Sequence, residues 1–321
     1  VTHDASRAPA SIHFLLAVAP EPARRGLAWI DVSTGRFEAT HVDAARFGDE
    51  LARIAPVELL VRDDAPPLPA AWTDGRLTTA RPAWAFDAET AERTLKQQFG
   101  AASLEGFGFG PGDNVALGAA GAVLDYLKET QKSSLAHVDR LVAHQASDCL
   151  QIDEATRRSL EITQTLRGGS REGSLLGVID ETVTSMGARL LCDWLASPLA
   201  SVNAIAARHD ALEEFFGDVL LVGQLREALR STYDLPRLLA RVASGRASPR
   251  DLSFIARTLH AIPPVKTALA EQSASRLRQL HESIDLCEDL RQRLDAALEP
   301  DCPLSPRDPG YIKEGYHAEL D

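Results

Sequence analysis

The chain has 321 residues, 45% of them hydrophobic, and a formal net charge of −12. This length suits two domains better than one, and the apolar content allows a sizeable buried core. A protein that grips nucleic acid through its phosphates normally shows a basic face. The acidic excess here runs through both halves of the sequence, so composition gives no support for DNA binding.

The sequence has no apolar run near the roughly 18 residues that a membrane helix needs. Its four cysteines lie far apart and form neither a CxxC motif nor a Cys/His ligand set, so we expect reduced thiols in a cytoplasmic protein. The chain begins with Val1 rather than methionine, which indicates a piece of a longer protein.

The first part of the chain predicts a mixed α/β module that ends near residue 130. Short runs rich in Val, Ile, Phe and Trp predict strands, and the segment from Asp31 to Gly35 has the turn-forming residues of a hairpin. An amphipathic stretch follows at residues 44–54. The expected strands cover residues 12–18, 26–32, 36–42 and 57–61, and the expected helices cover residues 87–99 and 114–131.

Beyond residue 130 the pattern is helical throughout, with no convincing strand. Asp153 is a suitable N-cap for a helix that would run to about Leu166, and Ser201 is a plausible cap for a later apolar repeat. Ser248 followed by proline marks a strong helix start, because serine caps well and proline is tolerated at the first helical position. A long helical stretch at residues 275–298 comes last.

Asp31 is the main candidate for metal chemistry. RNase H-like nucleases and actin-like kinases place a metal-binding carboxylate on a strand beside a hairpin, as here. That chemistry needs two or three further carboxylates that converge on Mg²⁺. Glu38, Asp63 and Asp64 are candidates by residue type alone. We favour the alternative that Asp31 accepts hydrogen bonds within its own turn, and we assign no catalytic or metal residue.

Two glycine-rich segments and one histidine pair fall short of known motifs. Residues 106–112 depart from the GxGxxG phosphate-binding pattern, because its third glycine position falls on Pro111 or Asp113. Residues 168–173 surround a serine but are not GxSxG, and we expect a mobile loop. There is no Walker P-loop in the sequence. His137 and His144 lie about two helical turns apart without a third ligand, so core or surface roles are expected.

Two sets of arginines could meet phosphate, since guanidinium groups suit bidentate contacts. Each set has acidic neighbours, so pairing within the chain is the favoured interpretation, and the DNA-binding residues stay unknown. The first set surrounds the second glycine-rich segment and the other surrounds a turn. The sets are Arg157, Arg158, Arg167 and Arg171, and Arg237, Arg241, Arg246 and Arg250, of which Arg167, Arg171, Arg246 and Arg250 are the phosphate candidates.

Residues 150–161, which read LQIDEATRRSLE, resemble the opening of the core (lever) domain of the MutS family of DNA mismatch repair proteins. The segments at residues 173–180, 182–191, 233–238 and 248–252 follow in the family's order and spacing. The hairpin at residues 26–37 and the helix at residues 126–131 are similar to the MutS connector domain. The resemblance departs at residues 12–15, IHFL, where the family more often has Asn-Asn-Tyr-Leu, and at Pro236, where it has Glu.

The resemblance implies an RNase H-like α/β connector at residues 1–132 and the first part of an all-α core at residues 133–321, truncated before the clamp. Such a segment would be no enzyme. It would transmit signals between the DNA-binding end and the ATPase end of a longer protein, which would use ATP and Mg²⁺. That protein's partners would be mismatched duplex DNA, a MutL-type protein and a second copy of itself.

Two alternatives remain open at this point. The chain could come from a MutS homologue that acts in recombination, since such homologues tend to lack the N-terminal recognition domain and this chain begins after it. It could also be a metal-dependent nuclease centred on Asp31.

Overall fold

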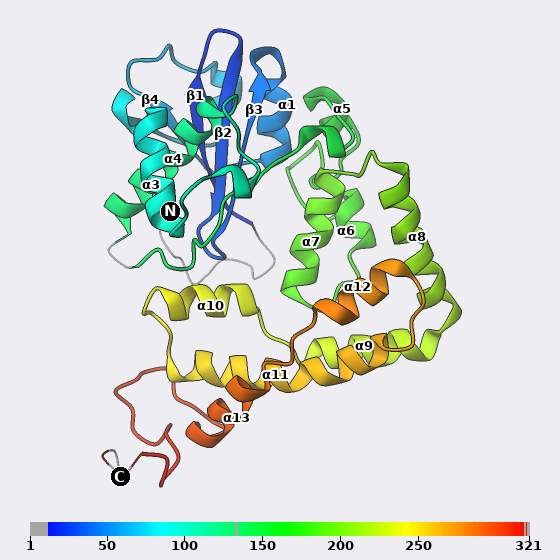
Figure 1. Ribbon diagram of the computed structural model, residues 1–321. Helices are drawn as coiled ribbons and strands as arrows, with labels where there is room; N and C mark the ends of the chain where they lie inside the picture. Colours follow the sequence, from blue (N-terminus) through cyan, green and yellow to red (C-terminus); the bar gives the residue numbers. More distant parts are fainter. Residues whose placement is uncertain (1–11, 132–133, 318, 320–321) are drawn as a thin grey trace. The chain divides into compact units, whose positions relative to one another are not determined.

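The computed structural model describes residues 12–131, 134–317 and 319 (Figure 1). The chain forms two compact units. The sheet unit contains residues 1–180 and 189–198, and the helical unit contains residues 181–188 and 199–321. Helix α7, Ser185–Ala196, contributes residues to both. The residues that follow β6, as far as Asp180, belong to the sheet unit.

The sheet unit contains one six-stranded sheet of order β5-β4-β1-β2-β3-β6. Strands β1, β2 and β3 are antiparallel neighbours, while β4, β5 and β6 each run parallel to the strand they pair with. The four strands expected from the sequence are confirmed. The strands are β1 Phe14–Pro20, β2 Arg24–Asp31, β3 Arg36–Asp43, β4 Glu58–Arg62, β5 Leu77–Arg81 and β6 Val142–Ala143.

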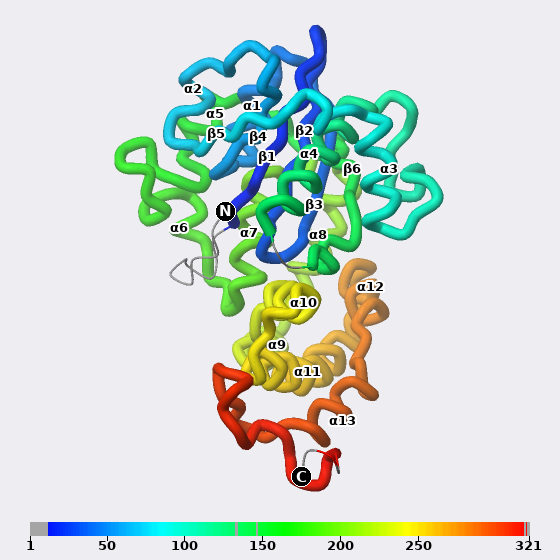
Figure 2. Tube along the Cα trace, turned by 90° about the vertical axis from the view of Figure 1, so that its left-hand side faces the viewer, coloured from blue at the N-terminus to red at the C-terminus, as the bar shows by residue number. Residues whose placement is uncertain are grey.

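Each face of the sheet buries its own core, because successive side chains of a strand point to opposite faces. Leu15 and Ile30 belong to the core under helices α3, Ala88–Phe99, and α4, Asn114–Thr130. Leu16 and Trp29 belong to the core under helix α1, Phe47–Ile54. Figure 1 shows α1 on one side of the strands and α3 and α4 on the other, and Figure 2 shows α4 in front of the strands.

Short helical elements connect these parts of the sheet unit. They are η1 Ala44–Arg46, α2 Ala70–Thr73, η2 Ala83–Phe86, η3 Glu105–Phe107, η4 Ala146–Asp148, α5 Glu154–Ser159 and α6 Leu175–Ile179.

The helical unit shows the helix starts expected from the sequence. The Ser201 hydroxyl accepts a hydrogen bond from the Ala204 amide at 3.4 Å, and Ser248 forms a capping box with Asp251. Helices α10 and α11 pack around Leu238, Ile255 and other apolar side chains. The helices are α8 Val202–Gly217, α9 Val219–Arg230, α10 Leu235–Ala243, α11 Pro249–Leu269, α12 Ser275–Ser283 and α13 Glu288–Ala297.

Three sequence predictions about elements are wrong. The helix capped by Asp153 ends at Ser159 rather than Leu166, and Glu161 has a φ of 48° that no helix continues through. The stretch at residues 275–298 forms two helices, because Cys287 adopts a left-handed φ of 46° between them. The segment beyond residue 130, expected to lack strands, contains the two-residue strand β6.

Candidate functional site

A cluster of charged side chains in the sheet unit joins the sheet to segments that lie more than 100 residues later in the chain. We call this cluster the ionic joint and define it as Arg36, Glu38, Glu50, Arg53, His144 and Asp193. The parallel pairing of β3 with β6 places Glu38 opposite Val142. His144 comes two residues after Val142, and its side chain therefore lies beside that of Glu38. The His144 amide also donates to the Ala39 carbonyl at 2.9 Å.

Glu38 is the centre of the joint on strand β3. Its carboxylate accepts a hydrogen bond from Arg36 Nε at 2.5 Å and lies 3.4 Å from His144 Nδ1. Arg36 also pairs through Nη1 with Asp193 on helix α7. The side chains of Glu38 and His144 are only 10% and 13% exposed, so the two groups interact with little screening by solvent.

Helix α1 supplies the second half of the joint. Arg53 Nε donates to Glu50 at 2.7 Å, and its Nη1 lies 3.3 Å from the Ser197 hydroxyl just beyond α7. The guanidinium group also stacks 5.1 Å from the centre of the Trp29 ring. The His144 ring meets the same Trp29 ring edge-on, with centroids 5.3 Å apart. One tryptophan therefore positions both halves of the joint.

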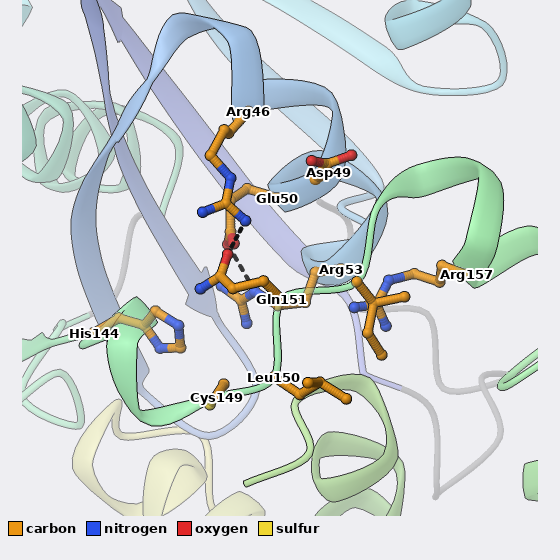
Figure 3. A pocket seen from close by; sticks show the side chains of 10 residues that line it. Arg46, Asp49, Glu50, Arg53, His144, Cys149, Leu150, Gln151 and Arg157 are labelled. Atoms are coloured by element: carbon orange, nitrogen blue, oxygen red, sulfur yellow. Dashed lines mark hydrogen bonds and ion pairs between the residues drawn. The ribbon is translucent and has the colours of Figure 1, made fainter. Parts of the chain in front are cut away.

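The same helix contacts the segment that leads into α5. Asp49 accepts a hydrogen bond from the Glu154 amide at 2.8 Å, and Arg46 donates to the Gln151 side chain. A shallow hollow lies between these groups, and Figure 3 shows the guanidinium groups of Arg46 and Arg53 beside Gln151, with Arg157 across from them. The segment is thus held by side-chain bonds at several points.

The pKa values of Arg36, Glu38 and Asp193 are shifted by their neighbours in the joint. Burial works to raise the pKa of Glu38, but hydrogen bonds from His144 and Arg36 overcome it, and the pKa is lowered. Burial also opposes the charge of Arg36, yet the carboxylates of Glu38 and Asp193 raise its pKa. Burial dominates at Asp193 and raises its pKa despite Arg36. The joint is therefore an interlocked set of charges rather than a row of independent pairs.

Asp31 accepts hydrogen bonds within its own turn, as we expect from the sequence. Its carboxylate accepts hydrogen bonds from the Ser33 amide at 2.9 Å and the Ser33 hydroxyl at 2.6 Å, and its carbonyl accepts the Gly35 amide. Of the other carboxylates considered, Glu38 belongs to the ionic joint and Asp64 forms a two-bond pair with Arg62. Among the described residues, no three His, Cys, Asp or Glu side chains are grouped to hold a metal ion.

The histidines and glycine-rich segments have local partners. His137 Nε2 lies 3.1 Å from the Val32 carbonyl, whereas His144 belongs to the ionic joint. In the segment 106–112, the Gly110 amide donates to Asp113 at 2.8 Å, and Asp113 also contacts His41. The segment 168–173 is tied at one end by the Thr165 amide, which donates to the Ser170 carbonyl at 2.8 Å.

The two arginine sets form different kinds of contact. Arg171 pairs with Asp180 in the sheet unit. In the helical unit Arg241 donates to Asp251 at 2.6 Å, and Arg237 Nε lies 3.7 Å from Asp234. The candidates at the turn between α10 and α11 bind neutral oxygens instead: the Arg246 side chain donates to the Ser244 hydroxyl and the Arg250 side chain to the Cys302 carbonyl, both at 3.2 Å.

Sequence reasoning missed the ionic joint. The sequence suggests Glu38 and His144 only as possible metal ligands. It does not indicate a role for the other four members of the joint, which are Arg36, Glu50, Arg53 and Asp193. One pattern in the sequence does point to the joint: Arg36 and Glu38 are charged residues whose neighbours in the strand are apolar. Their partner on α7 lies 157 residues from Arg36, and no local pattern indicates such a pairing.

Comparison with known proteins identifies the family of both parts of the chain. The family model for MutS domain II matches residues 13–139, and the model for MutS domain III matches residues 155–320. The chain belongs to the MutS family. The match to domain II contains strands β1 to β5 with α1, α3 and α4, strand β6 lies between the two matches, and the match to domain III contains α7 and the helical unit.

Curated relatives agree with this assignment. A DNA mismatch repair protein MutS from Rhodopirellula baltica is 52% identical over 300 residues, which are 92% of this chain and 33% of that protein. MutS proteins from Symbiobacterium thermophilum and Anaeromyxobacter dehalogenans are 38% and 40% identical and are matched over 36% of their own length. The chain therefore spans about a third of the length of these relatives.

The ionic joint involves both MutS domains. Arg36, Glu38 and Arg53 lie in the match to domain II, Asp193 lies in the match to domain III, and His144 lies between the two matched regions. Within the described ranges, no helix is long and apolar enough to cross a membrane.

Proposed function

We propose that this chain is the connector and first core segment of a DNA mismatch repair protein, and that it transmits conformational signals between the DNA-binding end and the ATPase end. The observation that carries the proposal is the ionic joint, because its Arg36–Asp193 ion pair and its Arg53–Ser197 hydrogen bond link domain II to domain III. Signals pass between distant sites through packed elements that have discrete arrangements.

The physical properties of the joint suit this role. Apart from Arg36, which is 45% exposed, its side chains are largely removed from water, so a buried charge that loses its partner is costly and the buried contacts tend to break together. Helix α7 adds a second suitable feature, because the division between the two compact units falls within this one helix. A conformational change in either unit therefore affects α7, and the ion pair of Asp193 with Arg36 attaches α7 to strand β3.

The connector is proposed to be RNase H-like and to end near residue 132, with the core from residue 133 onward. The strand order β5-β4-β1-β2-β3, with β1 to β3 antiparallel, supports this classification. Mismatched duplex DNA, a MutL-type partner, a second MutS copy, and ATP with Mg²⁺ are proposed for the longer protein in the cytoplasm. Phosphate contacts from Arg167, Arg171, Arg246 or Arg250 belong to the same proposal.

Substitution of Arg36 and Asp193 in the full-length repair protein tests the proposal. We expect Arg36→Gln and Asp193→Asn each to weaken the effect of nucleotide on mismatch affinity by roughly two- to thirtyfold, because residues on a coupling route contribute that much. Mismatch affinity without nucleotide and basal ATPase activity should change little. The measurement is mismatch affinity by anisotropy with and without ATP.

Arg62→Gln is the matched control, because Arg62 forms an exposed ion pair with Asp64 on the same sheet. This control should leave the nucleotide effect intact. Full nucleotide coupling in both joint variants, or an equal loss in the Arg62 control, would contradict the transmission role.

A further inference from the structure

The hollow beside helix α1 is lined by more guanidinium groups than carboxylates. Three guanidinium groups line it, from Arg46, Arg53 and Arg157, together with the carboxylates of Asp49 and Glu50. Glu50 is engaged by Arg53 at 2.7 Å. One oxygen of Asp49 accepts the Glu154 amide. The lining therefore has one guanidinium group more than it has carboxylates, in a chain whose net charge is −12.

Two hydrogen-bond donors of this hollow are buried without a partner. Within the described part of the chain, Arg53 Nη2 and Arg157 Nε are removed from solvent and make no hydrogen bond. Buried polar groups in folded proteins are nearly always satisfied, so each such donor indicates a missing acceptor. Burial and the nearby Arg53 charge lower the pKa of Arg157, which agrees with incomplete neutralisation by Glu50 and Asp49.

The two buried free donors belong to two different arginines. Arg53 Nε already binds Glu50, so Arg53 offers an incoming anion only its Nη groups. A tetrahedral oxyanion can accept from separate directions. The hollow is open to solvent and has room for about one water-sized group, so one oxygen of such an anion could enter while the others stay hydrated.

We propose that the hollow lined by Arg53 and Arg157 binds a phosphate-type oxyanion. One oxygen enters between the two guanidinium groups and accepts their free N–H donors, and Arg46 adds a third positive charge at the rim. This inference is independent of the proposed transmission role, since it concerns only the lining of the hollow. Binding would nevertheless lie next to the joint, because Arg53 belongs to both.

Titration with inorganic phosphate tests the site on the whole ¹⁵N-labelled chain. At constant ionic strength we expect a saturable displacement of the arginine Nε–H resonances of Arg53 and Arg157. Chloride and acetate at the same ionic strength should produce a clearly smaller displacement. An equal response to chloride or acetate would overturn the assignment to a phosphate-type anion.

Arg157→Gln should weaken phosphate binding about tenfold, the effect of losing one charge-assisted hydrogen bond. Arg158→Gln is the matched control, because Arg158 is the adjacent exposed residue of α5 and does not line the hollow. Arg157→Lys keeps the charge but removes the Nε–H donor and should also bind more weakly than the unsubstituted chain. Unchanged affinity in both Arg157 variants, or an equal loss in Arg158→Gln, would overturn the proposal.

Discussion

Glu38 and Asp193 are two carboxylates of one joint whose pKa values shift in opposite directions. The pKa of Glu38 is lowered in the folded chain, so this residue stabilises the fold above its ordinary pKa of 4.5 and loses that contribution as pH falls through the lowered value. The pKa of Asp193 is raised above 3.8, so its ionisation opposes folding as pH rises through that window. Acid titration therefore affects the two carboxylates in opposite senses.

Glu38→Gln should reduce the acid sensitivity of the chain. At neutral pH we expect a loss of about 1–3 kcal/mol in the free energy of unfolding, because charged hydrogen bonds from Arg36 and His144 are weakened. As pH falls from about 4.5 through the lowered pKa of Glu38, the difference from the unsubstituted chain should shrink, because the carboxylate loses its stabilising contribution over this range. Urea unfolding at a series of pH values measures both effects.

Asp193→Asn should change the pH dependence of the free energy of unfolding in the opposite direction to Glu38→Gln. It removes a carboxylate whose folded-state pKa is raised, so the part of the pH profile that opposes folding should disappear. A loss of stability in Glu38→Gln that is the same at every pH would contradict the assigned direction for Glu38.

The sequence predicts single residues well where their partners are near in the chain. Asp31 binds Ser33, two residues away, and the turn composition from Asp31 to Gly35 indicates this directly. His144 could not be placed in the same way, because its position beside Glu38 depends on the pairing of β6 with β3. Asp193 is harder still, since no local pattern connects it to Arg36.

At the scale of elements, helix α4 packs closely against the end of η2 through a glycine. A Cβ at Gly118 would lie 2.4 Å from the Phe86 carbonyl oxygen, and this backbone atom cannot move aside easily. Gly223 in helix α9 has the opposite surroundings, with no atom within 4 Å of a built Cβ. The two glycines therefore have different physical reasons for being tolerated in a helix.

Gly118→Ala and Gly223→Ala should change stability in opposite directions. We expect Gly118→Ala to cost about 1–3 kcal/mol through overpacking between α4 and the segment at Phe86. Gly223→Ala should stabilise the chain by about 0.5–1 kcal/mol, because alanine loses less backbone entropy in a helix. Thermal and urea unfolding measure both changes, and a neutral Gly118→Ala would mean that α4 shifts to accept the methyl group.

Helix starts could be predicted from the sequence, while helix interruptions could not. Ser201 and Ser248 are recognisable caps, since their side chains bond to amides three residues later. The break between α12 and α13 depends on a left-handed Cys287, a conformation that residue type does not indicate. Strand β5 was missed because four of its five residues are not buried and its pattern resembles a loop.

At the scale of the whole molecule, net charge and the pairing of arginines determine the expected behaviour toward DNA. The chain has a net charge of −12, and Arg171 and Arg241 already pair with carboxylates. Non-specific affinity for DNA comes mainly from cations on one surface that meet phosphates. The general architecture of a mixed sheet module followed by helices could be predicted, because each half has a different apolar period.

The isolated chain should bind duplex DNA with a dissociation constant on the order of 10⁻⁴ M or weaker at physiological salt. It should not prefer a G·T mismatch over matched duplex, since reading a mismatch needs an inserted side chain or an element in a groove. Fluorescence anisotropy with both duplexes at two salt concentrations measures this. Submicromolar affinity, or a tenfold mismatch preference, would reveal a DNA-binding surface in this segment.

The long separation between Arg36 and Asp193 has a consequence for synthesis. These residues are 157 positions apart, and a ribosome that adds about 5–20 residues per second needs roughly 8–30 s to cover that distance. During this interval the nascent β3 strand presents Arg36 without its partner on α7. The hairpin of β2 and β3 can form within microseconds, so the joint closes last. A chaperone or the ribosome surface would thus encounter the sheet while Arg36 still lacks its ion pair with Asp193.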